Sequence, residues 1–147
     1  MREVRLRGKL LGKNKWLYGY YLKRWIGTAY KHYIHDGLYE YEVDPATVGQ
    51  FTGLKDINGV EIYEGDILVQ DCYLWFDDGR PNYRGTVEWI YSQWQVVAHC
   101  VNPNKRGISD GMNESLNDVG WNEGTNSVWE IIGNIYDNPE LLGRKPC

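Results

Sequence analysis

Four carboxylates lie close together in the segment FTGLKDINGVEIYEGDILVQ. Asp56, Glu61, Glu64 and Asp66 are near enough in sequence to supply an acid–base pair or the oxygen ligands of a hard cation. A calcium loop needs oxygen ligands at its first, third and fifth positions and glycine at its sixth. Counted from Asp56, Gly59 falls at the fourth position and no acid stands at the fifth. The segment therefore does not match a calcium loop.

Other signatures of chemistry are missing from the sequence as well. It has no G-x-x-x-x-G-K-[ST], no G-x-S-x-G and no G-x-G-x-x-G, so no phosphate cradle or nucleophile elbow is indicated. His32 and His35 are three residues apart on a predicted strand, where they point to opposite faces and make a poor zinc pair. We expect a protein that is not an enzyme, with no metal site and no cofactor, and the sequence indicates no particular small molecule.

The better interpretation of the carboxylate segment is a pair of turns. Asn58-Gly59 and Glu64-Gly65 accept positive φ, so each predicts a tight turn. Asp66 is expected to accept hydrogen bonds from turn amides, whereas Glu61 is expected on the outer face. The predicted structural turn motif comprises Gly53, Asp56, Asn58, Gly59, Glu64, Gly65 and Asp66.

Basic and aromatic residues alternate near the N-terminus, which is a pattern suited to nucleic acid. Phosphates would meet basic side chains, and bases would stack on aromatic ones such as Trp16, Tyr18 and Tyr20. The candidate binding residues are Arg5, Arg7, Lys13, Lys15, Lys23 and Arg24. Two features oppose this reading: the chain is acidic, with a pI near 5.4, and alternating aromatics on strands more often fill a core.

Charge is divided sharply along the chain. Residues 1–31 hold nine Lys/Arg and one acid, residues 32–79 hold one Lys and eleven acids, and the net charge of the whole is −4. Segments of opposite charge can meet within a subunit or between neighbours, and head-to-tail contacts between neighbours close into rings. We therefore expect the main partner to be a second copy of the chain, in a homo-oligomer or ring, with nucleic acid as the alternative.

The compartment is indicated by cysteine usage and hydropathy. Cys72, Cys100 and Cys147 form neither a CxxC pair nor an even framework, which favours reduced thiols in a cytoplasmic protein. No apolar run is long enough for a signal peptide or a membrane span, so no membrane association is expected.

Strand signals dominate the remaining sequence. KWLYGYYLKRW places Trp16, Tyr18, Tyr20 and Leu22 on one face, with Leu17 and Tyr21 on the other. Two hairpins are predicted, one turning at Asp36-Gly37, which tolerates a type I′ turn, and one turning at Ser92-Gln93. Short helical turns are predicted after the caps Asp44 and Asn138, each followed by proline. Residues 102–127 are predicted to be a long insertion with one short helix at residues 114–119.

Two longer motifs resemble a known family. VGQFTGLKDINGVEIYEGDILVQ resembles the signature of the YopX family, which is known from bacteriophages and prophages, and WEIIGNIYDNPELL resembles the usual end of the same family. The resemblance covers 37 of the 147 residues. It implies a phage or prophage protein, in the cytoplasm of a bacterial or phage-infected host cell, with an SH3-like small barrel in its C-terminal portion. It does not imply any particular activity, because the family has no settled biochemical function.

These observations lead to one expected architecture. The fold is predicted to be mainly β, or α+β at most, with one or two short helices. Residues 1–47 are expected to form a basic, aromatic-rich β-hairpin region. Residues 48–147 are expected to form the SH3-type barrel domain that carries the insertion.

Overall fold

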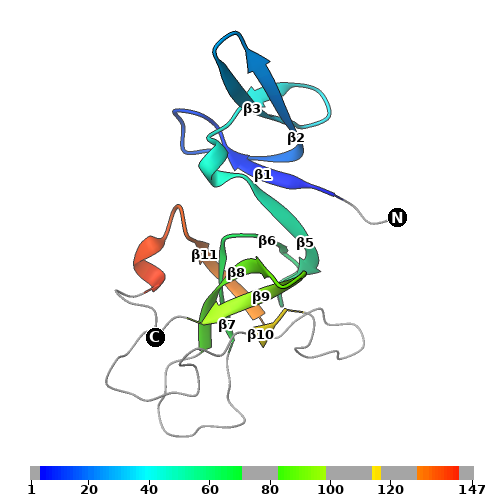
Figure 1. The fold of residues 1–147 in the computed structure, drawn as a ribbon. Helices are drawn as coiled ribbons and strands as arrows, with labels where there is room; N and C mark the ends of the chain where they lie inside the picture. Colours follow the sequence, from blue (N-terminus) through cyan, green and yellow to red (C-terminus); the bar gives the residue numbers. More distant parts are fainter. Residues whose placement is uncertain (1–3, 71–82, 99–113, 117–128, 143–147) are drawn as a thin grey trace, which may run out of the picture. The chain divides into compact units, whose positions relative to one another are not determined.

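The chain folds into two antiparallel sheets joined by turns. The computed structural model describes residues 4–70, 83–98, 114–116 and 129–142, so all three cysteines lie outside the described residues. The mainly β prediction is confirmed (Figure 1). The strands are β1 (Leu6–Lys9), β2 (Trp16–Ile26), β3 (Ala29–His35), β4 (Glu40–Glu42), β5 (Gly49–Lys55), β6 (Glu61–Tyr63), β7 (Asp66–Gln70), β8 (Tyr83–Ile90), β9 (Gln93–Ala98), β10 (Glu114–Ser115) and β11 (Trp129–Asn134).

The chain divides into two compact units, which are described separately below. The first unit is Met1–Gly53 and the second is Leu54–Cys147. The division falls within β5, six residues beyond the boundary expected from the sequence at residue 47. That these parts are independent domains stays a prediction.

The first unit is a sheet built on the long strand β2. Its strands run in the order β4-β3-β2-β1-β5. β1 pairs with the first part of β2, from Trp16 to Gly19, and β3 pairs with the second part, from Tyr20 to Ile26. The hairpin between β2 and β3 turns at Gly27, whose φ of 68° suits glycine. This two-residue hairpin loop was not predicted from the sequence.

A small core lies on one face of this sheet. Its buried residues are Leu17, Ile34 and Val43, and partly buried Tyr21 packs against them. Leu17 and Tyr21 therefore lie on the core face of β2, and the alternation of a strand places Tyr18 and Tyr20 on the other face. The expectation that the alternating aromatics fill a core is wrong for these two residues, which are 46% and 66% exposed.

The turn between β3 and β4 differs from the predicted type I′ turn. His35 pairs with Glu40, so four residues form the loop rather than two. The Asp36 carboxylate accepts hydrogen bonds from the backbone N–H groups of Leu38 and Tyr39, both at 2.9 Å. This side-chain cap stabilises the longer loop, in which Gly37 has positive φ.

A short 3₁₀ helix, η1 (Pro45–Thr47), then leads into β5. The side chain of Asp44 accepts a hydrogen bond from Ala46 N at 3.0 Å, as the sequence predicted for an N-cap. The second predicted helical turn is also present, as η2 (Pro139–Leu142).

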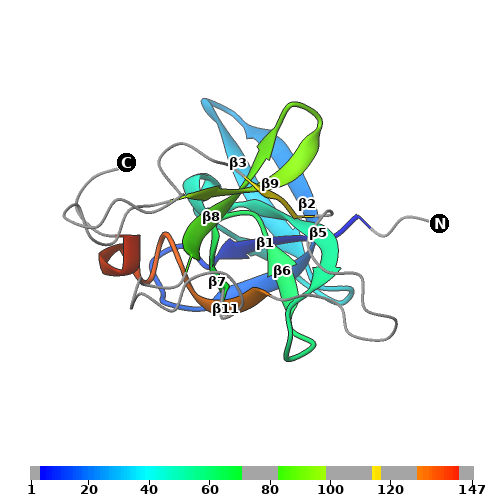
Figure 2. The same cartoon turned by 90° about the horizontal axis from the view of Figure 1, so that it is seen from below.

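The second unit contains a five-stranded sheet with the order β10-β9-β8-β7-β11. Figure 2 shows β11 beside β7, and β8 and β9 as a hairpin. The buried core comprises Ile62, Leu68, Val87, Trp94, Val96, Leu116 and Trp129. The last residues of β5 belong to this unit, and β6 follows β5 in the strand order.

The β8–β9 hairpin turns one residue earlier than predicted. Ile90 pairs with Gln93, so the loop is Tyr91-Ser92 rather than Ser92-Gln93. Both loop residues have positive φ, 49° and 64°. These values match the type I′ turn that two-residue hairpins prefer, although neither residue is glycine or asparagine.

The helix expected at residues 114–119 is wrong at its first two positions. Glu114 and Ser115 instead form β10, which pairs antiparallel with Val96 and Gln95 of β9. Leu116 N donates a hydrogen bond to Trp94 O at 2.9 Å, and the Leu116 side chain is buried in the core. Burial of Leu116 against the sheet outweighs the local tendency of this polar segment to form a helical turn.

Neither sheet closes into a barrel within the part of the chain that the structure describes. The five-stranded sheet has β10 and β11 as its two edges. The SH3-like barrel therefore stays a prediction. No helix among the described residues has the length and apolar character needed to cross a membrane.

Candidate binding surface

The carboxylate of Asp56 is held by backbone amides of its own unit. Its Oδ1 accepts hydrogen bonds from Asn58 N and Val60 N, both at 2.9 Å. Its Oδ2 accepts a third from Ile131 N at 3.1 Å, which ties the β5–β6 turn to β11. Asp56 is only 2% exposed. These contacts give the side chain a structural task, because three amides that would otherwise lose their water partners are satisfied.

Asp66 stabilises the next turn in the same manner. Its Oδ2 accepts a hydrogen bond from Tyr63 N at 2.8 Å, and the residue is 2% exposed. Half-buried Glu64 lies within this turn between β6 and β7. The side chain of Glu61 accepts a hydrogen bond from the hydroxyl of Tyr63 at 2.9 Å. Glu61, which the sequence placed on the outer face, is half-buried, and its partner Tyr63 is buried.

The glycines of the predicted turn motif have left-handed backbone angles. φ is 86° at Gly53, 79° at Gly59 and 84° at Gly65. A Cβ on Gly59 would meet open space, whereas one on Gly65 would lie 3.3 Å from the ring of Tyr136. Among the described residues no group of three or more His, Cys, Asp or Glu side chains could hold a metal ion.

Two of the basic candidate residues form contacts at the β2–β3 hairpin. Arg24 donates a bidentate pair of hydrogen bonds to the carboxylate of Glu40, with nitrogen–oxygen distances of 2.5 and 2.6 Å. This hydrogen-bonded carboxylate raises the pKa of Arg24 above its ordinary value. Lys23 Nζ lies 4.2 Å from the ring centroid of Tyr30. Both cations are thus engaged by groups of their own sheet.

The other candidates lie on or near β1. Arg7 is 6% exposed, and its Cζ lies 4.6 Å from the ring centroid of Trp16. Lys13 and Lys15 are exposed in the turn between β1 and β2. Half-buried Arg5 lines a hollow on the sheet. The structure thus does not gather the six predicted residues into one patch.

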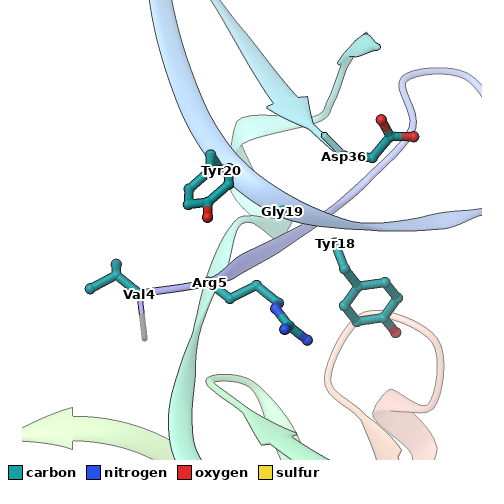
Figure 3. Close-up of a pocket in the computed structure, with 6 residues that line it drawn as sticks. All are labelled: Val4, Arg5, Tyr18, Gly19, Tyr20 and Asp36. Atoms are coloured by element: carbon teal, nitrogen blue, oxygen red, sulfur yellow. The ribbon is translucent and has the colours of Figure 1, made fainter. Parts of the chain in front are cut away.

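The hollow has a volume of about 260 Å³ and lies on the first unit. Figure 3 shows Tyr18 and Tyr20 on either side of Gly19, with the Arg5 side chain between them. Val4 and Asp36 complete the lining. The carboxylate of Asp36 points away from Arg5 in this view. The lining therefore combines two exposed aromatic rings with one permanent cation.

Sequence reasoning missed Val4, Gly19 and Asp36 as parts of this hollow. Asp36 comes from the β3–β4 loop, and only the pairing of Tyr20 with His35 brings that loop beside Gly19. A local signal existed for Tyr18 and Tyr20, because basic and aromatic residues alternate there. No local signal existed for the loop.

The comparisons with known proteins cover most of the chain. A similar solved structure is the crystal structure of protein EF1440 from Enterococcus faecalis, with 21% identity, 95% coverage of this chain, 98% coverage of that chain and a TM-score of 0.43. No curated protein matches the chain significantly. The family model described as YopX protein matches residues 13–143, which is most of the chain. The chain therefore belongs to the YopX family.

Proposed function

We propose that this chain is a non-enzymatic binding module that assembles with further copies of itself. The observation that carries the proposal is the opposite charge of its two compact units. Met1–Gly53 contains nine Lys/Arg and five Asp/Glu, whereas Leu54–Cys147 contains seven Lys/Arg and fifteen Asp/Glu. Opposite fields of this kind steer association and favour contact between the basic unit of one copy and the acidic unit of the next.

Charge pairing inside the first unit does not cancel its excess of bases. Arg24 pairs with Glu40, and Lys31 Nζ lies 3.2 Å from Glu42. Each pair removes one base and one acid, so the difference between bases and acids is unchanged. Lys13 and Lys15 remain exposed in the β1–β2 turn. A contact between the basic unit of one copy and the acidic unit of the next is head-to-tail. Such contacts close into a ring when the rotation that relates successive copies divides evenly into a full turn.

A non-enzymatic role also agrees with the structural contacts of Asp56 and Asp66 in the turn motif. Asp56 and Asp66 are buried and accept hydrogen bonds from backbone amides. A carboxylate engaged in this way is committed to holding a turn rather than to moving protons. This supports a structural role for the turn motif, which we include in the proposal.

The test is molar mass by light scattering, at low salt and at about 1 M salt, where the Debye length falls to about 3 Å. We expect a mass above the monomer's 17.1 kDa at low salt and a lower mass at high salt. Lys13→Glu and Lys15→Glu should each weaken association. Lys55→Glu is the matched control, because it makes the same charge change on the acidic unit. A monomer that is independent of salt would refute the proposal.

Three finer expectations belong to the same proposal. We infer an SH3-like small barrel in the second unit, supported by its run of short antiparallel strands β7, β8 and β9. We infer a phage or prophage origin from the resemblance of the two motifs to their family. We infer a cytoplasmic place of action from the cysteine pattern.

Nucleic-acid binding is a second candidate function, and one observation favours it. The first unit has more bases than acids, and it leaves large aromatic side chains exposed on its sheet. The sequence argument against this function assumed that those aromatics fill a core. Tyr18, Tyr20, Trp25 and Tyr30 are instead 46–66% exposed.

A further inference from the structure

The hollow beside Gly19 has the features of a site for one flat ring with an attached negative charge. We propose that it binds single-stranded nucleic acid, with a base against Tyr18 or Tyr20 and a neighbouring phosphate at Arg5. This site goes beyond self-association and gives the nucleic-acid candidate a specific location.

The two tyrosines supply the stacking surfaces. They lie two residues apart on β2, so their rings project from the same face of the strand. That face is opposite the small core, and the rings are 46% and 66% exposed. Base–aromatic stacking tolerates any sequence, because every base has a π-face. The hollow is therefore expected to accept any unstacked base and not to distinguish one nucleotide sequence from another.

Gly19 lines the hollow and allows β2 to approach the end of β3 closely. A Cβ at this position would lie only 2.0 Å from the carbonyl oxygen of His35. The close approach of β2 to the end of β3 thus requires glycine. This close approach holds the start of the β3–β4 loop, and with it Asp36, beside the hollow.

The charges of the lining favour an anion on the Arg5 side. Arginine stays protonated at any working pH, and its planar group matches a phosphate. Asp36 does not oppose this, because its carboxylate accepts hydrogen bonds from Leu38 N and Tyr39 N and is directed toward its own loop. The excess of bases in the unit adds a longer-range attraction for a polyanion.

A duplex is a poor fit for the same hollow. Its bases are paired and stacked on one another, so a single ring cannot enter between the tyrosines without being flipped out. A single strand presents its bases freely. We therefore expect a preference for single-stranded over duplex oligonucleotides.

The experiment is a fluorescence-anisotropy titration of the full chain with labelled oligo-dT and with a duplex, at about 50 mM salt. We expect oligo-dT to bind more tightly than the duplex. Tyr20→Ala and Arg5→Gln should each weaken oligo-dT binding by about tenfold or more, and Tyr20→Phe should retain it because the ring remains.

Tyr39→Ala is the matched control. Tyr39 has the same 66% exposure as Tyr20 and lies in the same unit, but it does not line the hollow. It should leave binding unchanged. Equal losses for Tyr20→Ala and Tyr39→Ala would overturn the proposal. So would affinity for oligo-dT no tighter than the nonspecific background of about 10⁻⁴ to 10⁻⁶ M.

Self-association is distinguished by measuring the mass of each variant under the same conditions. If the hollow is the site, Tyr20→Ala loses oligonucleotide binding while keeping the wild-type mass. A loss of binding found only in variants that also lose assembly would refute the hollow as the site. It would place the nucleic acid at an interface between copies instead.

Discussion

At the scale of single residues, the buried carboxylates Asp56 and Asp66 define what the family motif does. Both residues are 2% exposed, and both accept hydrogen bonds from turn amides. A buried amide that loses its acceptor costs more free energy than the hydrogen bond itself contributes. The motif is therefore expected to govern stability.

The first prediction is that Asp66→Ala destabilises the protein by about 1–3 kcal/mol, because Tyr63 N is left buried without its acceptor. Asp66→Asn should cost less, since its amide oxygen can still accept. Thermal unfolding followed by circular dichroism gives the comparison. Exposed Glu140→Ala is the control and should have little effect.

The same measurement separates a turn from a metal site. We expect no change in melting temperature when calcium, magnesium or zinc is added. A rise of several degrees with one of these ions, abolished by Asp66→Ala, would show that the carboxylates hold a metal and that our interpretation of the motif is wrong.

The second prediction concerns the pKa of Asp36. Hydrogen bonds from Tyr39 N and Leu38 N lower this pKa below its ordinary value of 3.8. A lowered folded-state pKa adds stability above the unfolded pKa, and this contribution is lost as pH falls through the folded value. Carboxyl NMR should show the Asp36 midpoint below 3.8. A midpoint at or above that value would mean that the loop is open in solution.

Residue roles were predictable from sequence where the partners are local. Asp44 as a cap and Asp66 as a turn acceptor follow from short-range geometry. The contact between Arg24 and Glu40 was not predictable, because it depends on how β2, β3 and β4 align. The bond from Tyr63 to Glu61 was missed because the burial of Tyr63 depends on the rest of the unit.

At the scale of elements, the turns decide how the strands are arranged. The third prediction compares Gly65→Val with Gly59→Val, since both glycines have positive φ. Each change should cost on the order of 1–3 kcal/mol because a β-branched residue is strained there. Gly65→Val should cost more, since its side chain also meets Tyr136. Urea unfolding of both variants tests the order, and equal costs would contradict the role of Tyr136.

The fourth prediction concerns the Tyr91-Ser92 turn of the β8–β9 hairpin. Both residues have positive φ, which Asn-Gly adopts with less strain. The double variant Tyr91→Asn, Ser92→Gly should stabilise the protein by on the order of 1 kcal/mol. Calorimetry gives the change in melting temperature. Destabilisation would mean that 92%-exposed Tyr91 makes a contact that the isolated chain does not show.

The element predictions succeeded at only some of the turns that carry a local signal, since the turn at Gly27 was missed and the loop at Gly37 is longer than predicted. Glycine or capped proline marked several boundaries, whereas Tyr91-Ser92 carries no such signal and the hairpin was placed one residue late. β10 was predicted to be part of a helix, because its strand conformation is indicated only by its pairing with β9, which the sequence does not show. Pairing between distant segments cannot be read from local propensity.

At the scale of the whole molecule, the proposed self-association rests on the opposite net charges of the two compact units. The sequence allowed the mainly β class and the family to be predicted, because strand signals and two long motifs are local. It did not allow the strand order to be predicted, nor which of the described strands lie at the edges of the second sheet, since these depend on non-local pairing. The charge asymmetry was visible in the sequence, but its assignment to two compact units required the fold.

The most direct test of self-association is sedimentation velocity of the full chain over a series of concentrations at low salt. We predict that the sedimenting species grows with concentration to a fixed multiple of the 17.1 kDa chain. A single species of 17.1 kDa at every concentration would contradict the proposed function.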